Sequence, residues 1–514
     1  MKASAKDIAL IKKSNLVFRC RVELLDENLN FVQEITGDIY SASANLDATS
    51  DIRRTSNLEL HMPDGFSIED FMEQWLDNAV RLKVGLQDTH IAHFDKTTYV
   101  YYDIGVFLLS EGSLTYDATN RRMTISLVDL MAYGTAVRGS QIGLGISIPF
   151  ESNAADALGA VVARYMKLKF TDIAEFPDVI PYDLKFEGGS YPIDVMNKII
   201  SLFPNYEHYY GSDGFYHVEK IPTGMDEDVL LDETVLDDLI ISERPSGSLS
   251  AVKNTTEIWG RVLPADYVAT QCTLNDSTYT LGFLTEIQTI EPNATYCIVP
   301  DVDSPENPSI KIPLTGDATE TDTVTLYDSY GKTLKAGAMK AKLPYVMKCI
   351  MVEVEGVPTK KMYLQGEKTI HVIVREVNAM PTDEVIAEDK ALNDCNDILY
   401  VVNPDSPYAC DRKGKSISAG EVRQVFSGGD YASIYTTDLA FQRGKYENYL
   451  KARMNTDVEL KTILIPFIDV NEKIQYTSPN TGLVHQYMVK GVSMDLTGFT
   501  MTLKLSRFYN YYPF

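Results

Sequence analysis

Hydrophobic and polar residues alternate along much of the chain, which predicts that β-strands dominate. Near the C-terminus, Ile463–Tyr476 begins as a short apolar block and then alternates, and the polar turn Ser478–Gly482 follows it. The last predicted strand, Met501–Leu505, again alternates apolar with polar residues. This stretch therefore predicts a strand, a turn and a closing hairpin.

Part of the closing hairpin occurs twice. Leu114–Leu127 reads LTYDATNRRMTISL, and Val492–Leu505 reads VSMDLTGFTMTLKL. Laid over each other without a gap, the two segments align Asp117 with Asp495, and MTISL with MTLKL. Two interpretations stay open, because Asp-containing turns between Thr-rich strands are common. We prefer a duplicated β-domain over independent similarity, since each copy closes a β-rich block.

The first quarter of the chain is a meander of alternating segments with one helix. Ser67 is a suitable N-cap for that helix, with Asp70 at its N3 position. An apolar stripe at helical spacing is expected to face the core. It consists of Ile68, Phe71, Met72 and Trp75.

Residues 135–245 change to a mixed α and β pattern. A helix is expected over Asn153–Met166, with Asn153 as its cap. A second helix opens at Pro192, a favourable first helical position, and runs to Phe203. A hairpin with the turn Ser212–Gly214 follows, so this part is predicted to be a small separate domain.

The strand Val252–Val262 is assigned to the second β-domain, which is completed only after Thr456. The helix Thr437–Met454 is expected to lead back into that domain, with Leu439, Tyr446, Leu450 and Met454 roughly on one face. Between the strand and the helix lies an insertion of short strands rich in Asp, Thr and Pro.

The charge of the chain argues against a tight grip on nucleic acid. The sequence has 72 acidic and 47 basic residues, which gives a net charge of -25. Binding to DNA or RNA needs a positive surface that displaces counterions from phosphate. An acidic wall could still surround nucleic acid without holding it. Acidity that serves solubility alone is the alternative.

The six cysteines are scattered, without a CxxC pair, which fits folding in a reducing cytoplasm. The N-terminal apolar patch is too short for a signal peptide, and no window approaches the roughly 18 apolar residues of a membrane span. Stable insertion into a membrane is therefore not expected.

Familiar catalytic signatures such as HExxH, GxSxG and Walker A are missing from the sequence. His90, His93 and Asp95 could be imagined as metal ligands, but a closed zinc site needs four ligands and a surface role is favoured. Asp301 and Asp303 offer oxygens for a hard cation, without the Gly and bidentate Glu of a Ca²⁺ loop. No catalytic, cofactor-binding or metal-binding residue is assigned, and no cofactor is expected.

The apolar loop Gln141–Phe150 could line a channel or touch a membrane, although a buried strand is the favoured interpretation. Paired carboxylates for glycoside hydrolysis can be neither located nor dismissed in so acidic a chain.

Five segments of the sequence carry a resemblance to a known family: Asp51–Leu60, Tyr102–Leu109, Tyr116–Thr119, Val128–Met131 and Ile463–Ile474. They resemble the tail hub, or tail-tip, proteins of tailed bacteriophages. That family includes the baseplate hub of contractile-tailed phages and the N-terminal part of tail-associated proteins of long-tailed phages of Gram-positive hosts. The resemblance covers nearly the full length and is weakest over Leu263–Gly444. Family members tend to carry Trp at the position of Phe467.

The resemblance implies a mainly β chain with α+β parts and two similar tube-type β-barrel domains. Three subunits would then form a pseudo-hexameric ring of six barrels that matches a hexameric tail tube and presents threefold symmetry to the tip. The expected domains are a first barrel at 1–138, a small α+β domain at 139–245, a second barrel at 246–265 with 445–514, and a β-rich insertion at 266–444.

The resemblance also implies the partners and the location. The homotrimer would join a tail tube or distal tail protein above to a tip spike, fibre or tape-measure protein below. DNA would pass through the lumen without specific binding. The protein would be made in the host cytoplasm and reside at the tail tip of the virion, and a hydrolase or spike would be a separate protein. Two other functions stay open: a tail-associated peptidoglycan or glycan hydrolase, and a host-surface carbohydrate-binding protein that uses Tyr-rich loops.

Overall fold

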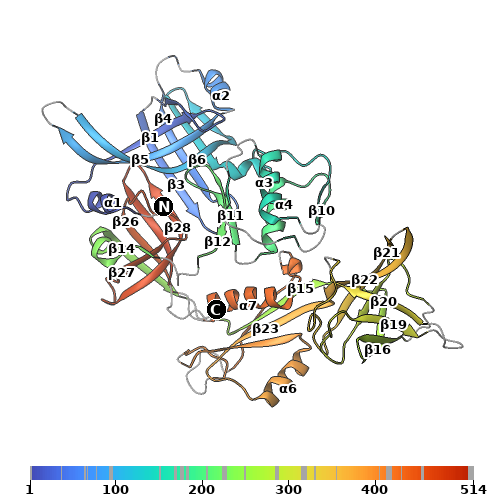
Figure 1. The fold of residues 1–514 in the computed structure, drawn as a ribbon. Helices are drawn as coiled ribbons and strands as arrows, with labels where there is room; N and C mark the ends of the chain where they lie inside the picture. The colour runs from blue at the N-terminus through green and yellow to red at the C-terminus, as the bar shows by residue number, and fades with distance from the viewer. Residues whose placement is uncertain are drawn as a thin grey trace. The chain divides into compact units, whose positions relative to one another are not determined.

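A computed structural model gives the structure of the chain (Figure 1). It describes residues 3–507 except 36–37, 63–64, 66, 77, 92–95, 150–151, 167–170, 174–178, 181–183, 204–205, 223–227, 248–250, 284–288, 314–320, 329–330, 355, 405, 412–419, 430 and 453–455. The chain forms two compact units. Unit 1 comprises residues 1–251 and 454–512, and unit 2 comprises residues 252–453. The chain is mainly β, as predicted, while the four predicted domain boundaries stay a prediction.

One large sheet organises unit 1. Its strand order is β14-β26-β29-β28-β3-β4-β7-β6-β5-β1-β2, with β27 and β13 attached at β28. In Figure 1 the C-terminal strand β28 therefore lies beside β3 from the start of the chain. The strands are β1 (Phe18–Leu25), β2 (Phe31–Glu34), β3 (Asp38–Asp47), β4 (Arg54–His61), β5 (Ala79–Ile91), β6 (Lys96–Asp117), β7 (Arg122–Asp129), β13 (Val229–Leu231), β14 (Ile240–Gly247), β26 (Thr456–Ile463), β27 (Lys473–Thr477), β28 (Val484–Asp495) and β29 (Thr500–Arg507).

The two ends of the chain share one hydrophobic core. Leu58 and Ile125 from the N-terminal strands belong to the same buried cluster as Leu460 and Leu503 from the C-terminal strands. The predicted alternation in β29 is confirmed, because Met501, Leu503 and Leu505 are buried while Lys504 is exposed. Burying one face of each strand fixes its register, because a slip by one residue would turn the apolar side chains to water.

Phe467, which takes the position of the tryptophan in the resembled family, is 4% exposed in this core. Its ring centroid lies 5.5 Å from that of Tyr102. The segments around these two residues, which are far apart in the sequence, therefore meet inside unit 1.

Two helices border the N-terminal half of the sheet. The Asp70 N–H donates to Ser67 Oγ at 3.2 Å, as the predicted cap of α2 (Ile68–Leu76) requires. Phe71 is buried, whereas Ile68 is 37% exposed, so only part of the predicted stripe faces the core. The side chains of Met72 and Trp75 lie outside the described residues. At the N-terminus, α1 (Ala5–Ile11) buries Leu10 and Ile11.

A smaller α and β part of unit 1 contains the predicted helices. Asn153 caps α3 (Ala154–Tyr165), since the Asp156 N–H donates to its Oδ1 at 3.0 Å. Pro192 opens α4 (Pro192–Ser201), as predicted. The remaining elements of this part are η2 (Leu130–Gly134), β8 (Ile146–Ile148), β9 (Thr171–Ile173), β10 (Leu184–Phe186), β11 (Tyr206–Tyr210) and β12 (Tyr216–Lys220). By contrast, α5 (Glu233–Leu236) and η3 (Asp237–Leu239) pack on the large sheet and contribute Val235, Leu236 and Leu239 to its core.

Unit 2 holds a four-stranded sheet of order β24-β23-β15-β25, packed against α7 (Thr437–Lys451). The bounds are β15 (Thr255–Val262), β23 (Thr369–Val377), β24 (Asp397–Val402) and β25 (Arg423–Phe426). The assignment of Val252–Val262 to the second β-domain is wrong, because β15 pairs with β23 and β25. The strands that pair with β26 are β14 and β29.

The predicted face of the helix after Thr437 is also wrong. Ala440, Gly444 and Asn448 are buried on α7, whereas Leu439 is only partly buried. A Cβ on Gly444 would lie 2.8 Å from Val374 Cγ2. Small residues therefore let this helix lie close against β23, and hydrophobic periodicity does not detect such a contact.

A closed seven-stranded barrel completes unit 2, with the order β16-β17-β19-β20-β22-β21-β18. Its core is a separate buried cluster that includes Tyr279, Ile310 and Met347. The strands are β16 (Tyr267–Asn275), β17 (Thr278–Phe283), β18 (Thr295–Ile298), β19 (Ser309–Pro313), β20 (Thr321–Tyr327), β21 (Tyr345–Val354) and β22 (Val357–Glu367).

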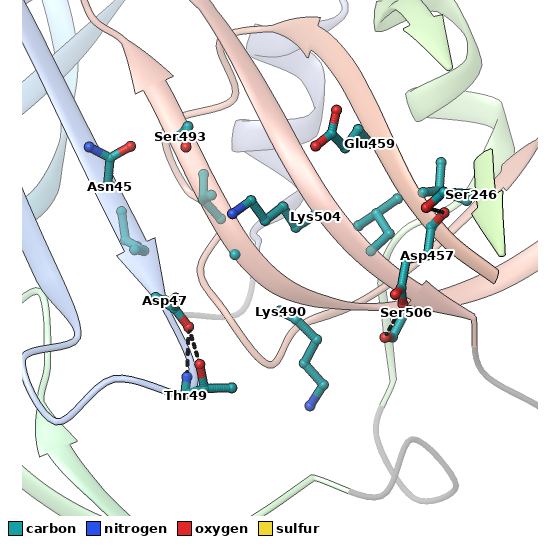
Figure 2. Close-up of a pocket in the computed structure, with 15 residues that line it drawn as sticks. Asn45, Asp47, Thr49, Ser246, Asp457, Glu459, Lys490, Ser493, Lys504 and Ser506 are labelled. Atoms are coloured by element: carbon teal, nitrogen blue, oxygen red, sulfur yellow. Dashed lines mark hydrogen bonds between the residues drawn. The ribbon is translucent and has the colours of Figure 1, made fainter. Parts of the chain in front are cut away.

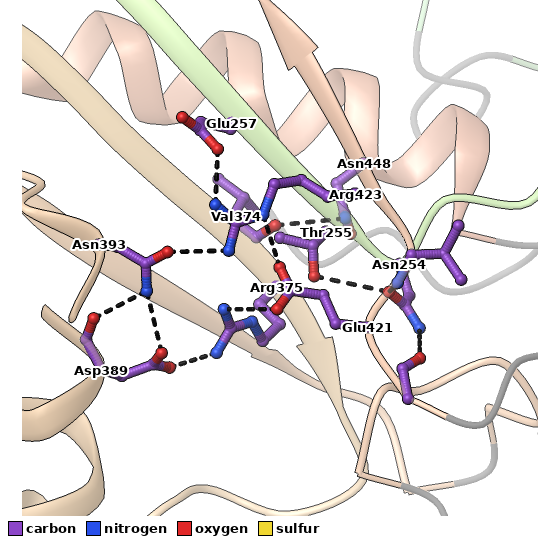
Figure 3. A network of polar contacts seen from close by, with 12 residues as sticks. Asn254, Thr255, Glu257, Val374, Arg375, Asp389, Asn393, Glu421, Arg423 and Asn448 are labelled. Atoms are coloured by element: carbon purple, nitrogen blue, oxygen red, sulfur yellow. Dashed lines mark hydrogen bonds and ion pairs between the residues drawn. The ribbon is translucent and has the colours of Figure 1, made fainter.

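A polar network ties α6 (Asp383–Asn393) to the four-stranded sheet (Figure 3). Arg375 on β23 pairs with Asp389 on α6 and, at 3.3 Å, with Glu421. Arg423 on β25 donates to Glu421 at 2.8 Å and to Glu257 on β15 at 2.7 Å. No described residue of α6 is fully buried, and Ile386 is partly buried against the apolar cluster of the sheet, so the ion pairs add to a small apolar contact. Because every charge here has a partner, we interpret the network as structural.

No helix among the described residues is long and apolar enough to cross a membrane. Within Gln141–Phe150, Ile148 is buried in the short strand β8, whereas Leu144 is 82% exposed. The favoured buried strand is therefore confirmed only for part of that loop, and Phe150 lies outside the described residues.

Candidate functional site

The hairpin that occurs twice in the sequence has the same geometry in both places. Asp117 Oδ1 accepts the Thr119 N–H at 2.9 Å, and Asp495 Oδ1 accepts the Thr497 N–H at 3.1 Å. Each turn then needs one residue in the left-handed region, and it is supplied at matching positions by Arg121 and Phe499, both with φ 52°. The two hairpins therefore share their turn chemistry as well as their sequence pattern.

The repeat extends beyond the hairpin to two further strands. In the first copy β4 lies between β7 and β3, and in the second copy β26 lies between β29 and β14. Both outer pairs contain a bulge at the same place, between Ile39 and Ser41 in β3 and between Ile240 and Ser242 in β14. A bulge is a specific local feature, so its recurrence in equivalent strands supports duplication over independent similarity.

The two copies join edge to edge. Strand β28 of the second copy pairs antiparallel with β3 of the first copy, over Gly491–Asp495 and Ser43–Asp47. Backbone hydrogen bonds extend the pairing at both ends, from the Ala48 N–H to the Lys490 C=O at 3.0 Å and from the Leu496 N–H to the Ala42 C=O at 2.9 Å. We call this contact the internal joint.

One face of the sheet is polar across the internal joint (Figure 2). Asn45 and Ser493 lie opposite each other on neighbouring strands there. In the adjacent row, exposed Lys504 lies opposite Gly491, and exposed Glu459 lies opposite Lys504. A hollow of about 570 Å³ lies at this place, and Gly491 and Ser493 help to line it. Hydroxyl and amide groups thus alternate with charges of both signs on this face.

At the end of the joint, the segments that carry the family resemblance meet in a buried polar junction. The Arg54 N–H donates to Asp129 Oδ2 at 2.8 Å, and the Arg54 guanidinium pairs with Asp469 at 2.5 Å. Next to it, Arg53 pairs with Glu207 at 2.8 Å, and Asn471 Nδ2 donates to the same carboxylate at 2.8 Å. The junction thus links both sheet copies to the α and β part of unit 1.

The charges in the junction respond differently to burial. Burial raises the pKa of Asp129 to about 6, although the N–H groups of Arg54 and Met131 favour its charged form. Burial alone would also raise the pKa of Asp469, but the charge and hydrogen bond of Arg54 hold it below its ordinary value. Burial lowers the pKa of Lys490, which donates to Asn471 Oδ1 at 3.2 Å. Arg54 and the neighbouring groups therefore outweigh the effect of burial on the pKa at Asp469, but not at Asp129.

These pKa shifts predict a pH dependence at Asp129. Its folded-state pKa lies above the unfolded value near 4, so the folded state binds the proton more tightly and gains stability as the pH falls from about 6 to about 4. Asp129→Asn removes this titration. We expect wild type to gain roughly 1 to 2 kcal/mol relative to the variant when urea unfolding is measured at pH 4.5 instead of pH 7. A difference that is constant with pH would contradict the assignment.

The candidate metal ligands are not brought together by the described part of the structure. Asp303 forms an ion pair with Lys340 at 3.0 Å and accepts the Ala341 N–H at 2.9 Å, so it has a structural role. The described residues contain no group of three or more potential metal ligands. His93 and Asp95 and the side chain of His90 lie outside the described residues.

Sequence reasoning quoted the segments of the junction but assigned no role to Arg53, Arg54, Asp129 or Asp469. A signal existed, because Arg53 directly precedes a strand whose apolar residues face the core and Arg54 is the first residue of that strand. Arginines next to such a strand are expected to be buried only with partners.

The sequence and the fold were compared with those of known proteins. A family model described as a domain of unknown function (DUF5048) matches residues 405–512. No curated protein matches the sequence.

Three solved structures are similar over most of the chain. A tail protein from Neisseria meningitidis MC58 has a TM-score of 0.43 at 7% identity and covers 95% of this chain and 96% of its own. The 43 kDa tail protein of prophage MuSo2 from Shewanella oneidensis has a TM-score of 0.41 at 8% identity, and the match covers 95% of this chain and 98% of the Shewanella chain. Prophage tail protein gp18 from Listeria monocytogenes EGD-e has a TM-score of 0.38 at 9% identity, and the match covers 95% of this chain and 94% of the Listeria chain.

Two of these structures are described as prophage tail proteins, and the third is described as a tail protein. The TM-scores lie below 0.5, so these similarities do not establish a role. The function proposed below is argued from the duplicated sheet of this chain.

Proposed function

We propose that the chain is a structural hub of a bacteriophage tail that acts as a homotrimer and encloses part of the DNA ejection channel. The observation that carries this proposal is the internal joint, at which two copies of one four-stranded unit continue into a single sheet. A chain that contains two equivalent units is suited to a ring, because the contact between the copies can be repeated between subunits.

Three such chains supply six quasi-equivalent units, the number that a hexameric tail tube requires. The copies differ in what connects their strands. Strands β3 and β4 are joined by a short turn over Ala48–Arg53, whereas the whole of unit 2 stands between β14 and β26. The insertion occurs in one copy of two, so a ring with six similar units would carry unit 2 at three positions. This is how a sixfold tube can be adapted to a threefold tip.

The polar face across the internal joint is suited to the wall of a channel. Its exposed residues are hydroxyl and amide side chains and charges of both signs, among them Ser493, Asn45, Lys504 and Glu459. Such a surface offers no continuous positive track for phosphate, and the chain as a whole has a net charge of -25. DNA would therefore slide past it without being held.

The sequence motifs support a place at the tail tip of the virion. There the hub would contact a tail tube or distal tail protein on one side, and a spike, fibre or tape-measure protein on the other. In this role the chain is a structural component and not an enzyme.

Light scattering on the purified chain tests the proposal. The expected particle has three times the sequence mass of 57.5 kDa and forms a ring with a pseudo-sixfold outline in negative stain. A particle that remains at the monomer mass at every concentration, with no ring, would contradict the trimer. Clearing of host cell walls by the purified chain would instead favour a hydrolase.

A further inference from the structure

The internal joint shows how one strand edge is divided between two partners. Along one edge of β28, Val484–Met488 pairs with β27, and Gly491–Asp495 pairs with β3 of the other copy. The opposite edge of β28 pairs with β29. Both parts of the edge are thus occupied in the second copy.

The equivalent edge in the first copy is only half occupied. There β6 corresponds to β28 and pairs with β5 over Lys96–Phe107. Its later segment Leu114–Asp117 pairs with β7 on one side, and no strand in the described part of the chain pairs with the other side. At the far end of the sheet, β14 corresponds to β3, and its outer edge is the end of the strand order. In the first copy, β6 therefore lacks the partner that β28 has in the second copy. In the second copy, β14 lacks the partner that β3 has in the first copy.

We infer that β14 of one subunit pairs antiparallel with Leu114–Asp117 of β6 in a second copy of this chain, in the register of the internal joint. This inference rests on the proposed trimer and names the surfaces that would close it. The register follows from matching β6 to β28 through the repeated hairpin, and β14 to β3 through the shared bulge. The resulting opposed residues are Leu114 with Gly247, Thr115 with Ser246, Tyr116 with Pro245, and Asp117 with Arg244.

The charges at these positions are complementary. Where the internal joint places Asp495 opposite Ser43, the contact between subunits would place Asp117 opposite Arg244. Arg244 is exposed within its own chain. Opposite charges that face each other across neighbouring strands stabilise the pairing, whereas like charges oppose it. The change from serine to arginine thus favours pairing with β6 of another subunit.

Pro245 distinguishes the contact between subunits from the internal joint. It takes the position of Ala44, whose backbone faces β28, so the new ladder lacks one N–H donor. Proline is tolerated on an edge strand, where it also discourages unspecific pairing. We therefore expect the contact between subunits to be weaker than the joint within the chain.

Paired cysteines test the register directly in the full chain. Asn45 and Ser493 form a non-hydrogen-bonded pair of the internal joint, and Thr115 and Ser246 are their equivalents. Such pairs have Cα atoms about 4.5 Å apart, which suits a disulfide. The double variant Thr115→Cys with Ser246→Cys should lose most of its monomer band after mild oxidation, and covalent trimers should be the largest product.

Matched controls separate this contact from others. Thr115→Cys with Ser242→Cys moves one thiol by four residues, about 13 Å along the strand, and should not cross-link. The single variants and wild type, with its six cysteines, report any background. Arg244→Glu should raise the concentration of half assembly about tenfold. Lys185→Glu reverses an exposed charge on β10, which pairs with β8 outside the large sheet, and should leave that concentration unchanged.

The outcomes distinguish the two proposals. A trimer by light scattering that does not cross-link through Thr115→Cys and Ser246→Cys would overturn the pairing of β14 with β6 and leave the trimer standing. Equal cross-linking of the Ser242 control would overturn the register. A chain that neither trimerises nor cross-links would overturn both proposals.

Discussion

Replacing Arg54 with alanine is expected to lower the free energy of unfolding of unit 1 by about 3 to 5 kcal/mol. Arg54 is 1% exposed and neutralises Asp469, while its backbone holds the carboxylate of Asp129. Alanine keeps the backbone bond but removes the cation from Asp469, whose side chain is 26% exposed, and it empties the space of a fully enclosed side chain. The loss is large because Arg53, the other cation near Asp469, is already paired with Glu207.

Tryptophan fluorescence can measure this effect in one unit at a time. The chain has two tryptophans, Trp75 in unit 1 and Trp259 in unit 2. In a Trp259→Phe background, urea unfolding followed at Trp75 reports unit 1 alone. Arg122→Ala is the matched control, because Arg122 also pairs with a carboxylate, at 3.1 Å, but its side chain is 39% exposed. We expect only a small change for the control, and an equal change for both variants would contradict the buried junction.

Gly444→Leu is expected to lower the free energy of unfolding of unit 2 by about 3 kcal/mol. A Cβ at this position would lie 2.8 Å from Val374 Cγ2 and 3.3 Å from Ile258 Cγ1, so the helix α7 must move away from the sheet. The better helix propensity of leucine, worth less than about 1 kcal/mol, opposes this loss but does not cancel it.

Trp259 reports this unfolding in a Trp75→Phe background, since its ring stacks on His371 at a centroid distance of 3.6 Å within unit 2. Gly159→Leu in α3 is the control, because nothing lies within 4 Å of a Cβ at that position. There the helix propensity acts alone, so we expect a gain of about 0.5 to 1 kcal/mol. A gain at Gly444 as well would show that α7 does not lie close against β23.

The sequence predicted best what local chemistry decides. Asp117 and Asp495 identified the duplicated turn because an Asx side chain bonds its own backbone two residues on, a rule that holds in any context. Ser67, Asn153 and Pro192 located helix starts for the same reason. These residues act within a few positions of themselves, so the neighbouring sequence is sufficient.

The predictions that were wrong concern contacts between residues that are far apart in the sequence. The local sequence of β15 does not identify its neighbour β23, which comes more than a hundred residues later, so the strand was assigned to the wrong sheet. The buried face of α7 was missed because Ala440 and Gly444 carry little hydrophobic signal, although their small size sets the packing distance. The junction of Arg54 with Asp469 joins residues from opposite ends of the sequence, which no spacing rule connects.

The position at which unit 2 is inserted has a consequence for the evolution of this chain. The chain leaves the sheet at Gly247 and returns at Thr456, the residue directly opposite in the ladder, and the two ends of unit 2 meet where the Lys253 N–H donates to the Lys451 C=O at 2.8 Å. Unit 2 therefore begins and ends at neighbouring positions, as an inserted domain does. A lineage could exchange it for another domain, or reduce it to a turn like Ala48–Arg53, without altering a single strand of the sheet that receives it.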